Sequence, residues 1–233
     1  LDTAKFVRSI PRNIPMVWGG WHATFVAGNT VIHPLVDYVV AGIAELKVVE
    51  LTEYIRGGEV GPPPTTPGIL HKQGNLDYQV NKEVYVESDS LPAYHLIDID
   101  AYRSENNVAG MITSRGCPFR CNYCVIQQIR FSNRAIDSVV DEIEFLVGDN
   151  GFEVIRFADG LFFAQRARVE KIIGECQKRG LKFKWQSNVR PETFRRWSQE
   201  GMEWLVESGL DYVASGVESG SEFMLQRIQK DAT

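Results

Sequence analysis

The sequence is poor in cysteine and has no long uninterrupted apolar run. Only four of its 233 residues are cysteine, which is too few for a scaffold held together by disulfide bonds. Asp37 and Glu45 interrupt the most apolar stretch, so it falls short of the ~20 residues that a transmembrane helix needs. These absences exclude a small disulfide-rich fold and predict no transmembrane segment.

A strong excess of charge of either sign is also missing. The chain has 25 Lys and Arg against 30 Asp and Glu, a formal net charge of −5 and a pI near 5.5. This balance gives no electrostatic reason to expect nucleic acid or an anionic membrane surface as a partner. With 44% hydrophobic and 24% charged residues, the composition is typical of a globular protein of one or two domains.

Neither end of the sequence has the features of a natural terminus. The chain opens with Leu1 in polar, helix-like sequence, without an initial methionine or a signal peptide. It stops at Thr233, soon after a helical pattern begins at Ser221. We expect both ends to be cut from a longer protein.

The first 60 residues alternate between apolar strands and one amphipathic helix. Residues 14–20 predict a buried strand that ends in Gly19-Gly20, and residues 36–40 predict a second strand. A short helix is expected over residues 45–56, because apolar side chains recur on one face. Those side chains are Leu46, Val49, Leu51 and Tyr54. Alternation of this kind is typical of a parallel sheet.

Proline and glycine mark a connection in the middle of the chain. Residues 57–68 are too rich in both to continue a helix or a strand ladder. Residues 69–86 predict a small hairpin around a Gly-Asn pair, and we place a domain boundary in the polar stretch 88–107. The expected parts are residues 1–60, a linker with the hairpin over 61–107, and a second domain over 108–233.

The second domain shows the regular alternation of strands and helices that is typical of a parallel α/β fold. Strands are expected near Gly110, Glu153, Lys182 and Asp211. Apolar stripes with helical spacing run over residues 136–147 and 169–176 between them. We therefore predict four strand–helix units, which form an open sheet or part of a barrel. In either case ligands bind beyond the carboxyl ends of the strands.

Three of the four cysteines follow the first strand of this domain with the spacing Cys-x3-Cys-x2-Cys. They are Cys117, Cys121 and Cys124. Gly116 and Pro118 keep the segment a loop, so the three sulfurs can converge on one centre. A disulfide would leave one thiol over, and a closed zinc site would need a fourth ligand that does not follow nearby. Four cysteine thiolates normally hold a 4Fe–4S cluster. Three thiolates therefore suit such a cluster with one iron left open for a ligand.

Residues 117–124 resemble the cluster loop of the radical S-adenosylmethionine (SAM) superfamily, in which Tyr123 matches the aromatic residue before the last cysteine. The resemblance implies that the three cysteines bind the 4Fe–4S cluster and that SAM binds the open iron. One electron from the reduced cluster then breaks the S–C5′ bond of SAM and yields methionine and a 5′-deoxyadenosyl radical. The cofactors supply this chemistry, and the protein positions them.

Further matches to the superfamily lie at the ends of the next three strands. Residues 157–163 contain Asp159 and depart from the usual pattern at Gly160, which replaces a polar residue. Residues 187–190 follow the third strand, and residues 216–221 closely resemble the Gly-x-Glu-Ser-Gly-Ser motif. The resemblance implies SAM contacts from Tyr123, Asp159, Asn188, Arg190, Gly216, Glu218 and Ser219.

Several of these residues also have a purely structural interpretation. Tyr123 could pack in the core, Asp159 could cap a helix, and Arg190 could be a surface cation. Cys176 lies on the apolar stripe of a helix, so we expect it to pack in the core. Gly19 and Gly20 could form only a tight turn.

Residues 16–45 resemble the C-terminal part of the cobalamin-binding domain that precedes many radical SAM domains. In that family a double glycine, here Gly19 and Gly20, lies against the nucleotide tail of the corrinoid; Ala44 departs from the usual Gly-x-Gly-Glu segment. The expected fold is thus the end of a flavodoxin-like domain followed by the first four units of a partial barrel. The combination of motifs is most similar to the subgroup of the anaerobic magnesium-protoporphyrin IX monomethyl ester cyclase.

The resemblance implies a cytoplasmic enzyme that transfers a methyl group or cyclises or rearranges a small molecule oxidatively, with cobalamin and an electron donor such as flavodoxin or ferredoxin. Two other hypotheses are a structural metal-binding module without catalysis and a radical SAM methylthiotransferase. The second would need cysteines for another cluster, and only Cys176 remains.

Overall fold

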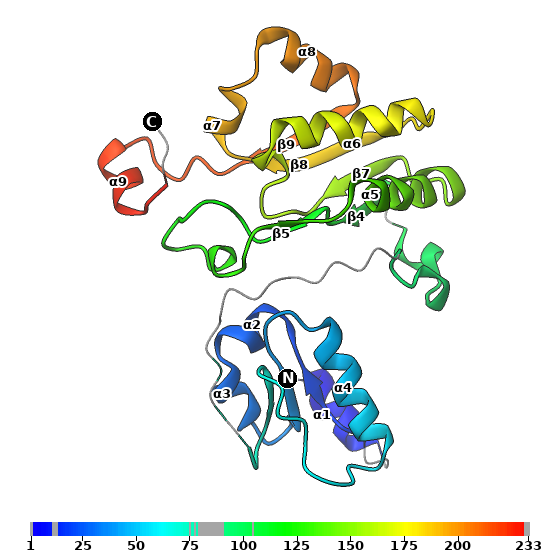
Figure 1. Ribbon diagram of the computed structural model, residues 1–233, viewed down its shortest axis with the longest axis vertical. Helices are drawn as coiled ribbons and strands as arrows, with labels where there is room; N and C mark the ends of the chain where they lie inside the picture. Colours follow the sequence, from blue (N-terminus) through cyan, green and yellow to red (C-terminus); the bar gives the residue numbers. More distant parts are fainter. Residues whose placement is uncertain are drawn as a thin grey trace. The chain divides into compact units, whose positions relative to one another are not determined.

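The computed structural model describes residues 2–10, 14–74, 76, 78, 91–103 and 105–230. The chain divides into two compact units, Leu1–Glu83 and Val84–Thr233, which are described separately below (Figure 1). Among the described residues, no helix has the length and apolar character to cross a lipid bilayer.

The first unit is a three-stranded sheet with helices on both faces. Its elements are α1 (Asp2–Ser9), β1 (Val17–Trp18), α2 (Gly20–Phe25), α3 (Ala27–Val31), β2 (Tyr38–Val40), α4 (Glu45–Arg56) and β3 (Ile69–His71). The strand order is β1-β2-β3, in which β1 runs parallel and β3 antiparallel to the central β2. The predicted parallel pairing of the first two strands is therefore confirmed.

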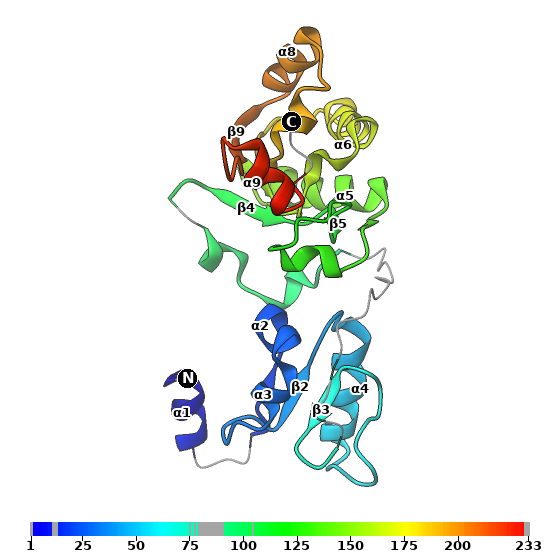
Figure 2. The ribbon, with the colours of Figure 1, turned by 90° about the vertical axis from the view of Figure 1, so that its left-hand side faces the viewer.

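Alternating side chains of β2 divide the core of this unit into two halves. Val39 packs with α2 and α3, whereas Tyr38 and Val40 pack with Leu51 of α4. This follows from the two-residue period of a strand, which sends successive side chains to opposite faces. Figure 2 shows α2 and α3 on one side of β2 and α4 on the other.

The helix predicted over residues 45–56 is confirmed, but its apolar face is not the predicted one. Leu51 is buried as expected, whereas Leu46 and Val49 are 71% and 54% exposed. Lys47 is buried in their place, and its Nζ donates to the carbonyl of Ala41 at 2.8 Å. A lysine fits the inner face of the helix because the buried carbonyl just after β2 accepts a hydrogen bond from it.

One other expectation for the first unit needs correction. The strand over residues 14–20 was predicted to be buried, but β1 is short, lies at the sheet edge, and leaves Val17 exposed. Residues Ile69–His71, the first part of the predicted hairpin, form β3 and pair with β2. The second half of that predicted hairpin lies outside the described residues.

The second unit is built on four parallel strands in sequential order. The strands are β4 (Val108–Met111), β7 (Val154–Phe157), β8 (Lys184–Val189) and β9 (Leu210–Ser215). The helices are α5 (Ile136–Ile143), α6 (Arg166–Lys178), α7 (Pro191–Phe194), α8 (Gln199–Glu207) and α9 (Glu222–Arg227), with a π-helical turn, η4, over Glu144–Asp149. Short 3₁₀ turns are η1 (Tyr94–Leu96), η2 (Ile99–Tyr102), η3 (Val125–Gln128) and η5 (Phe162–Ala164), and β5 (Ser114–Arg115) pairs with β6 (Ser132–Asn133).

The core of the second unit confirms the predicted helical stripes. Helices α5 and α6 pack side by side against the sheet (Figure 1). Val139 and Ile143 of α5 and Ile172 of α6 are fully buried. Phe157 at the end of β7 stacks on Phe162 with ring centroids 4.0 Å apart. The four predicted strand–helix units are present, and the carboxyl ends of all four strands meet at one edge of the sheet.

Candidate functional site

A cavity of about 330 Å³ opens at the carboxyl ends of the strands of the second unit. It is lined by residues from the cysteine loop, from the segment after β7, from the ends of β8 and β9, and from the chain after α9. These are Cys117, Cys121, Tyr123, Cys124, Gly160, Leu161, Asn188, Val189, Arg190, Ala214, Ser215, Gly216 and Lys230. The site thus lies where parallel α/β folds bind their ligands.

Two glycines let the cysteine loop fold back against its neighbours. Gly116 has φ +71°, and a Cβ there would lie 2.5 Å from the carbonyl oxygen of Ile129. A Cβ at Gly160 would lie 2.7 Å from the carbonyl oxygen of Gly116. The departure from the family pattern at Gly160 therefore has a physical reason, since the loop backbone occupies the space of a side chain.

The three cysteines of the loop line one cavity and are all free thiols. Cys121 is buried, and Cys117 and Cys124 are partly buried. Burial is the main cause that raises the pKa of the Cys117 thiol. No group of three or more His, Cys, Asp or Glu side chains in the described residues is arranged to hold a single metal ion. A 4Fe–4S cluster takes one thiolate per iron, so thiols spaced around a cavity fit such a cluster.

Arg190, which follows β8, places a cation against the cysteine loop. Its side chain is buried, lies over the ring of Phe119 with 3.9 Å between the guanidinium carbon and the ring centroid, and donates from Nη1 to Cys121 Sγ at 3.0 Å. Nε pairs with Glu192 at 3.2 Å. Nη2 is buried and has no hydrogen-bond partner. Arg190 is thus not a surface cation, and it keeps one donor available inside the site.

Asp159 ties the ends of two strands together. Its carboxylate accepts hydrogen bonds from the backbone N–H of Thr113 at 2.6 Å, from Thr113 Oγ1 at 2.6 Å and from the N–H of Ser114 at 2.9 Å. Burial raises the pKa of Asp159, and these hydrogen bonds oppose that rise. Asp159 does not line the cavity and caps no helix; it fixes the chain just before the cysteine loop.

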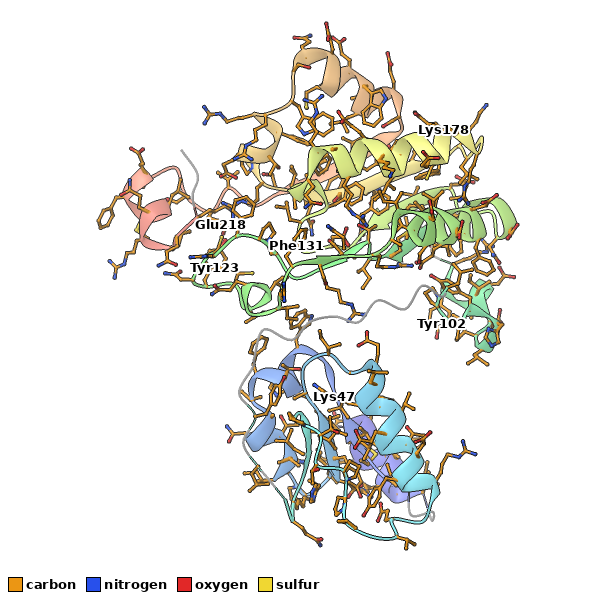
Figure 3. The ribbon with its side chains drawn as sticks, in the orientation of Figure 1. Lys47, Tyr102, Tyr123, Phe131, Lys178 and Glu218 are labelled. Atoms are coloured by element: carbon orange, nitrogen blue, oxygen red, sulfur yellow. The ribbon has the colours of Figure 1, made fainter. Side chains whose placement is uncertain are left out.

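Glu218 and Lys230 form a pair beside the cavity. Lys230 Nζ, which is buried, donates to the carbonyl of Gly216 and to Glu218 Oε1 at 3.1 Å. The bond to Lys230 is the main cause that lowers the pKa of Glu218, and a second bond, from Tyr123, lowers it further. Figure 3 shows Tyr123 and Glu218 next to one another, on the cysteine loop and on the segment after β9. A Cβ at Gly216 would lie 2.7 Å from Glu218 Oε1, so a side chain there would displace the Glu218 carboxylate.

The segment after α9 also holds the cysteine loop directly. Asn122 donates two hydrogen bonds to it, from its backbone N–H to the carbonyl of Ile228 at 3.1 Å and from Nδ2 to the carbonyl of Arg227 at 2.9 Å. Together with the Lys230 contacts, these bonds connect residues 227–230 to both sides of the cavity. We call residues 227–230 the clamp segment.

The structure brings together most, but not all, of the residues predicted to bind SAM. Tyr123, Asn188, Arg190 and Gly216 line the cavity with the three cysteines, whereas Asp159, Glu218 and Ser219 do not. Ser219 Oγ instead accepts a hydrogen bond from the N–H of Ser221 at 3.0 Å. Lys230 lines the cavity and was missed as a site residue. The sequence analysis offers no signal for it, because a lysine close to a helix end is ordinarily a solvated side chain.

Gly19 lies in the first unit between β1 and α2, and Gly20 is the first residue of α2. Gly20 has φ +84°, which favours glycine, and a Cβ at Gly19 would lie 3.3 Å from the carbonyl oxygen of Val40. The backbone conformation and the close approach of Val40 therefore account for both glycines as parts of a tight strand-to-helix turn. A Cβ at Gly20 would meet no atom within 4 Å, so the turn leaves space in front of it.

Comparison with known proteins finds a family match for the second unit. The family model for the radical SAM superfamily matches residues 111–233, which is more than half of the chain. The matched range includes the three cysteines of the loop, the four strand ends around the cavity and the clamp segment.

The curated relatives are methyltransferases by name. An uncharacterized methyltransferase of Pyrococcus horikoshii is 30% identical over 99% of this chain and 51% of its own length. An uncharacterized methyltransferase of Synechocystis is 24% identical over 91% of this chain and 37% of its own length. Cytidylyl-2-hydroxyethylphosphonate methyltransferase of Streptomyces wedmorensis is 22% identical over 91% of this chain and 46% of its own length. The chain spans about half the length of the curated relatives it matches, or less.

A solved structure shares the fold over the whole chain. The radical SAM methyltransferase TsrM of Kitasatospora setae matches with a TM-score of 0.74 at 19% identity, over 100% of this chain and 47% of that protein. Its structures were determined with tryptophan and a SAM analogue bound, and with cobalamin and a 4Fe–4S cluster bound. This likeness confirms the predicted α/β architecture.

Proposed function

This chain belongs to the radical SAM superfamily, and from that premise we propose that it is part of a cobalamin-dependent enzyme that transfers a methyl group to a small molecule. The observation that carries the proposal is the cavity at the strand ends, because three free thiols and a buried cation line it together. The methyltransferase names of the relatives favour methyl transfer over oxidative cyclisation or rearrangement.

Cys117, Cys121 and Cys124 are the proposed ligands of the 4Fe–4S cluster. When bound and reduced, the cluster supplies the electron that cleaves SAM into methionine and a 5′-deoxyadenosyl radical. Three ligands leave one iron open, in the way that catalytic metal sites keep a coordination position free. Cys176, the fourth cysteine of the chain, lies on α6 and is buried in the hydrophobic core. It therefore adds no ligand for the second cluster of a methylthiotransferase.

The remaining lining residues are proposed to hold SAM in front of the open iron. The unpartnered Nη2 of Arg190 suits a carboxylate, because guanidinium–carboxylate bonds are strong and directional. Asn188 offers an amide, and Gly216 lets the backbone approach a ligand closely. Tyr123 borders the cavity from the cysteine loop. Three predicted residues support this lining without being part of it. Glu218 holds Tyr123, Ser219 holds the turn before α9, and Asp159 holds the strand ends.

Cobalamin binding is proposed for the first unit, at the turn formed by Gly19 and Gly20. The proposal is supported by the open space in front of Gly20 and by the likeness of the whole chain to a fold that binds cobalamin in another protein. An electron donor such as flavodoxin or ferredoxin and a cytoplasmic location stay predictions.

Anaerobic reconstitution tests the proposed function. The chain is incubated with iron and sulfide without oxygen, and iron, sulfide and zinc are measured before SAM and a strong reductant are added. We expect about four irons and four sulfides per chain and reductive cleavage of SAM, with binding of added cobalamin. A chain that retains only zinc, or four irons without any SAM cleavage, would favour the structural metal-binding module.

A further inference from the structure

Arg190 has a contact that SAM binding does not require. Its Nη1 donates to the sulfur of Cys121 at 3.0 Å, while a different nitrogen, Nη2, is buried without a hydrogen-bond partner. The nitrogen that contacts the sulfur is therefore not the one that is proposed to bind SAM. The Cys121 sulfur is one of the proposed cluster ligands, so the guanidinium acts on the cluster through that ligand.

The surroundings of Arg190 make this contact electrostatically strong. The side chain is buried, and the ring of Phe119 covers its guanidinium face. A charge in such a setting is poorly screened by water, so its interactions exceed those of a surface cation. Glu192, which pairs with Nε at 3.2 Å, is the counter-charge and offsets part of the positive field.

Cluster potentials depend on the net charge nearby and on hydrogen bonds to the sulfurs. Reduction adds one electron, and hence one negative charge, to the cluster without making or breaking a bond. A buried cation that donates to a ligand sulfur stabilises the more negative, reduced form. A carboxylate next to that cation has the opposite effect.

We propose that Arg190 is a positioning residue that raises the reduction potential of the cluster through its hydrogen bond to Cys121, and that Glu192 limits this rise. The proposal rests on the proposed function, because it requires a cluster on the three cysteines. It assigns the pair a role in setting how readily the cluster accepts its electron from a one-electron donor.

The test is the midpoint potential of the reconstituted cluster in the full chain, followed by electron paramagnetic resonance during a redox titration. Arg190→Gln is expected to lower the potential, so that at a fixed potential the ratio of reduced to oxidised cluster falls by about tenfold, equivalent to about 59 mV for one electron. Arg190→Lys, which keeps the charge, should recover part of this loss. Arg196→Gln, which removes an exposed arginine of the same region, should leave the potential unchanged.

Glu192→Gln gives a second test with the opposite sign. Removal of the counter-carboxylate should raise the potential, a result that a merely structural role of the pair would not produce. Unchanged potentials in both variants, or shifts in the same direction, would overturn the proposal. If Arg190→Gln binds no iron, Glu192→Gln decides alone: a rise supports the proposal, and no change or a fall overturns it. Failure of the unaltered chain to assemble four irons would instead refute the proposed function.

Discussion

At the scale of single residues, the four cysteines separate into two chemical classes. Cys117, Cys121 and Cys124 line the cavity, whereas Cys176 is buried among the apolar side chains of α6. Burial raises the pKa of Cys176 to about 12, so this thiol stays protonated at neutral pH and is a poor metal ligand. The spacing of the first three and the helical position of the fourth made this division predictable from the sequence.

We predict that Cys121→Ala lowers the iron content and abolishes SAM cleavage, because the cluster loses one of three thiolates. Cys176→Ala serves as the matched control; it should keep about four irons and nearly full cleavage. Both variants are to be reconstituted without oxygen and assayed for iron and for cleavage products. Equal losses in the two variants would show that Cys121 is not a ligand of the cluster.

Asp159 was predicted to contact SAM or to cap a helix, and the structure gives it a different environment. Because three donors from Thr113 and Ser114 converge on its carboxylate, Asp159→Asn should destabilise the chain by about 1–3 kcal/mol, the usual result of leaving buried polar groups unpaired. Urea unfolding of the apoprotein measures the change. Asp149→Asn, at an exposed aspartate, should have an effect near zero; a similar stability for both variants would contradict the inferred role.

At the scale of elements, local patterns predicted more than long-range contacts. Strand–helix alternation located β4, β7, β8 and β9, and the helical period located α4, α5 and α6, because these signals lie within a dozen residues. The buried Lys47 and the position of β3 could not be predicted in this way. Each depends on β2, through the carbonyl of Ala41 in one case and a backbone ladder in the other.

The clamp segment is the clearest case of a site feature that sequence patterns do not reveal. It lies more than 100 residues from the cysteine loop, yet Asn122 donates to the carbonyls of Arg227 and Ile228. Lys230 reaches the carbonyl of Gly216 and Glu218 from the same segment. A lysine near a helix end is ordinarily a solvated side chain, and only the fold shows that this one is buried.

Loss of the clamp lysine should weaken SAM binding without removing the cluster. Lys230→Met leaves the carbonyl of Gly216 without its donor, and the loss of one charge-assisted hydrogen bond of about 1.5 kcal/mol corresponds to about tenfold in affinity. Equilibrium binding of SAM to the reconstituted protein measures it. Arg227→Met, which makes the same charge change at an exposed side chain, should bind SAM normally. A drop in iron content equal to the drop in SAM affinity would instead assign Lys230 to loop stability.

At the scale of the whole molecule, the order of the parallel sheet leaves β9 at an edge in the described residues. Tyr212 on this strand is 55% exposed. Exposed edge strands pair readily with other chains, so we predict that the 233-residue chain self-associates as its concentration rises, as sedimentation velocity would show.

A charged side chain on the edge strand should reduce this association. Tyr212→Lys introduces such a charge, as natural edge strands often do. Tyr102→Lys places the same charge on η2, at an exposed tyrosine away from β9. If the edge strand is responsible, only the first variant becomes monomeric; equal effects of both would assign the association to general charge or to another surface.

The central claim is that three cysteines hold a cluster whose fourth iron takes SAM as its ligand. The most direct measurement is electron–nuclear double resonance of the reduced, reconstituted chain with SAM labelled with ¹⁷O in its carboxylate and ¹⁵N in its amino group. We expect hyperfine coupling of both labels to the cluster, and loss of this coupling when SAM is removed. A four-iron cluster whose spectrum is the same with and without SAM would contradict it.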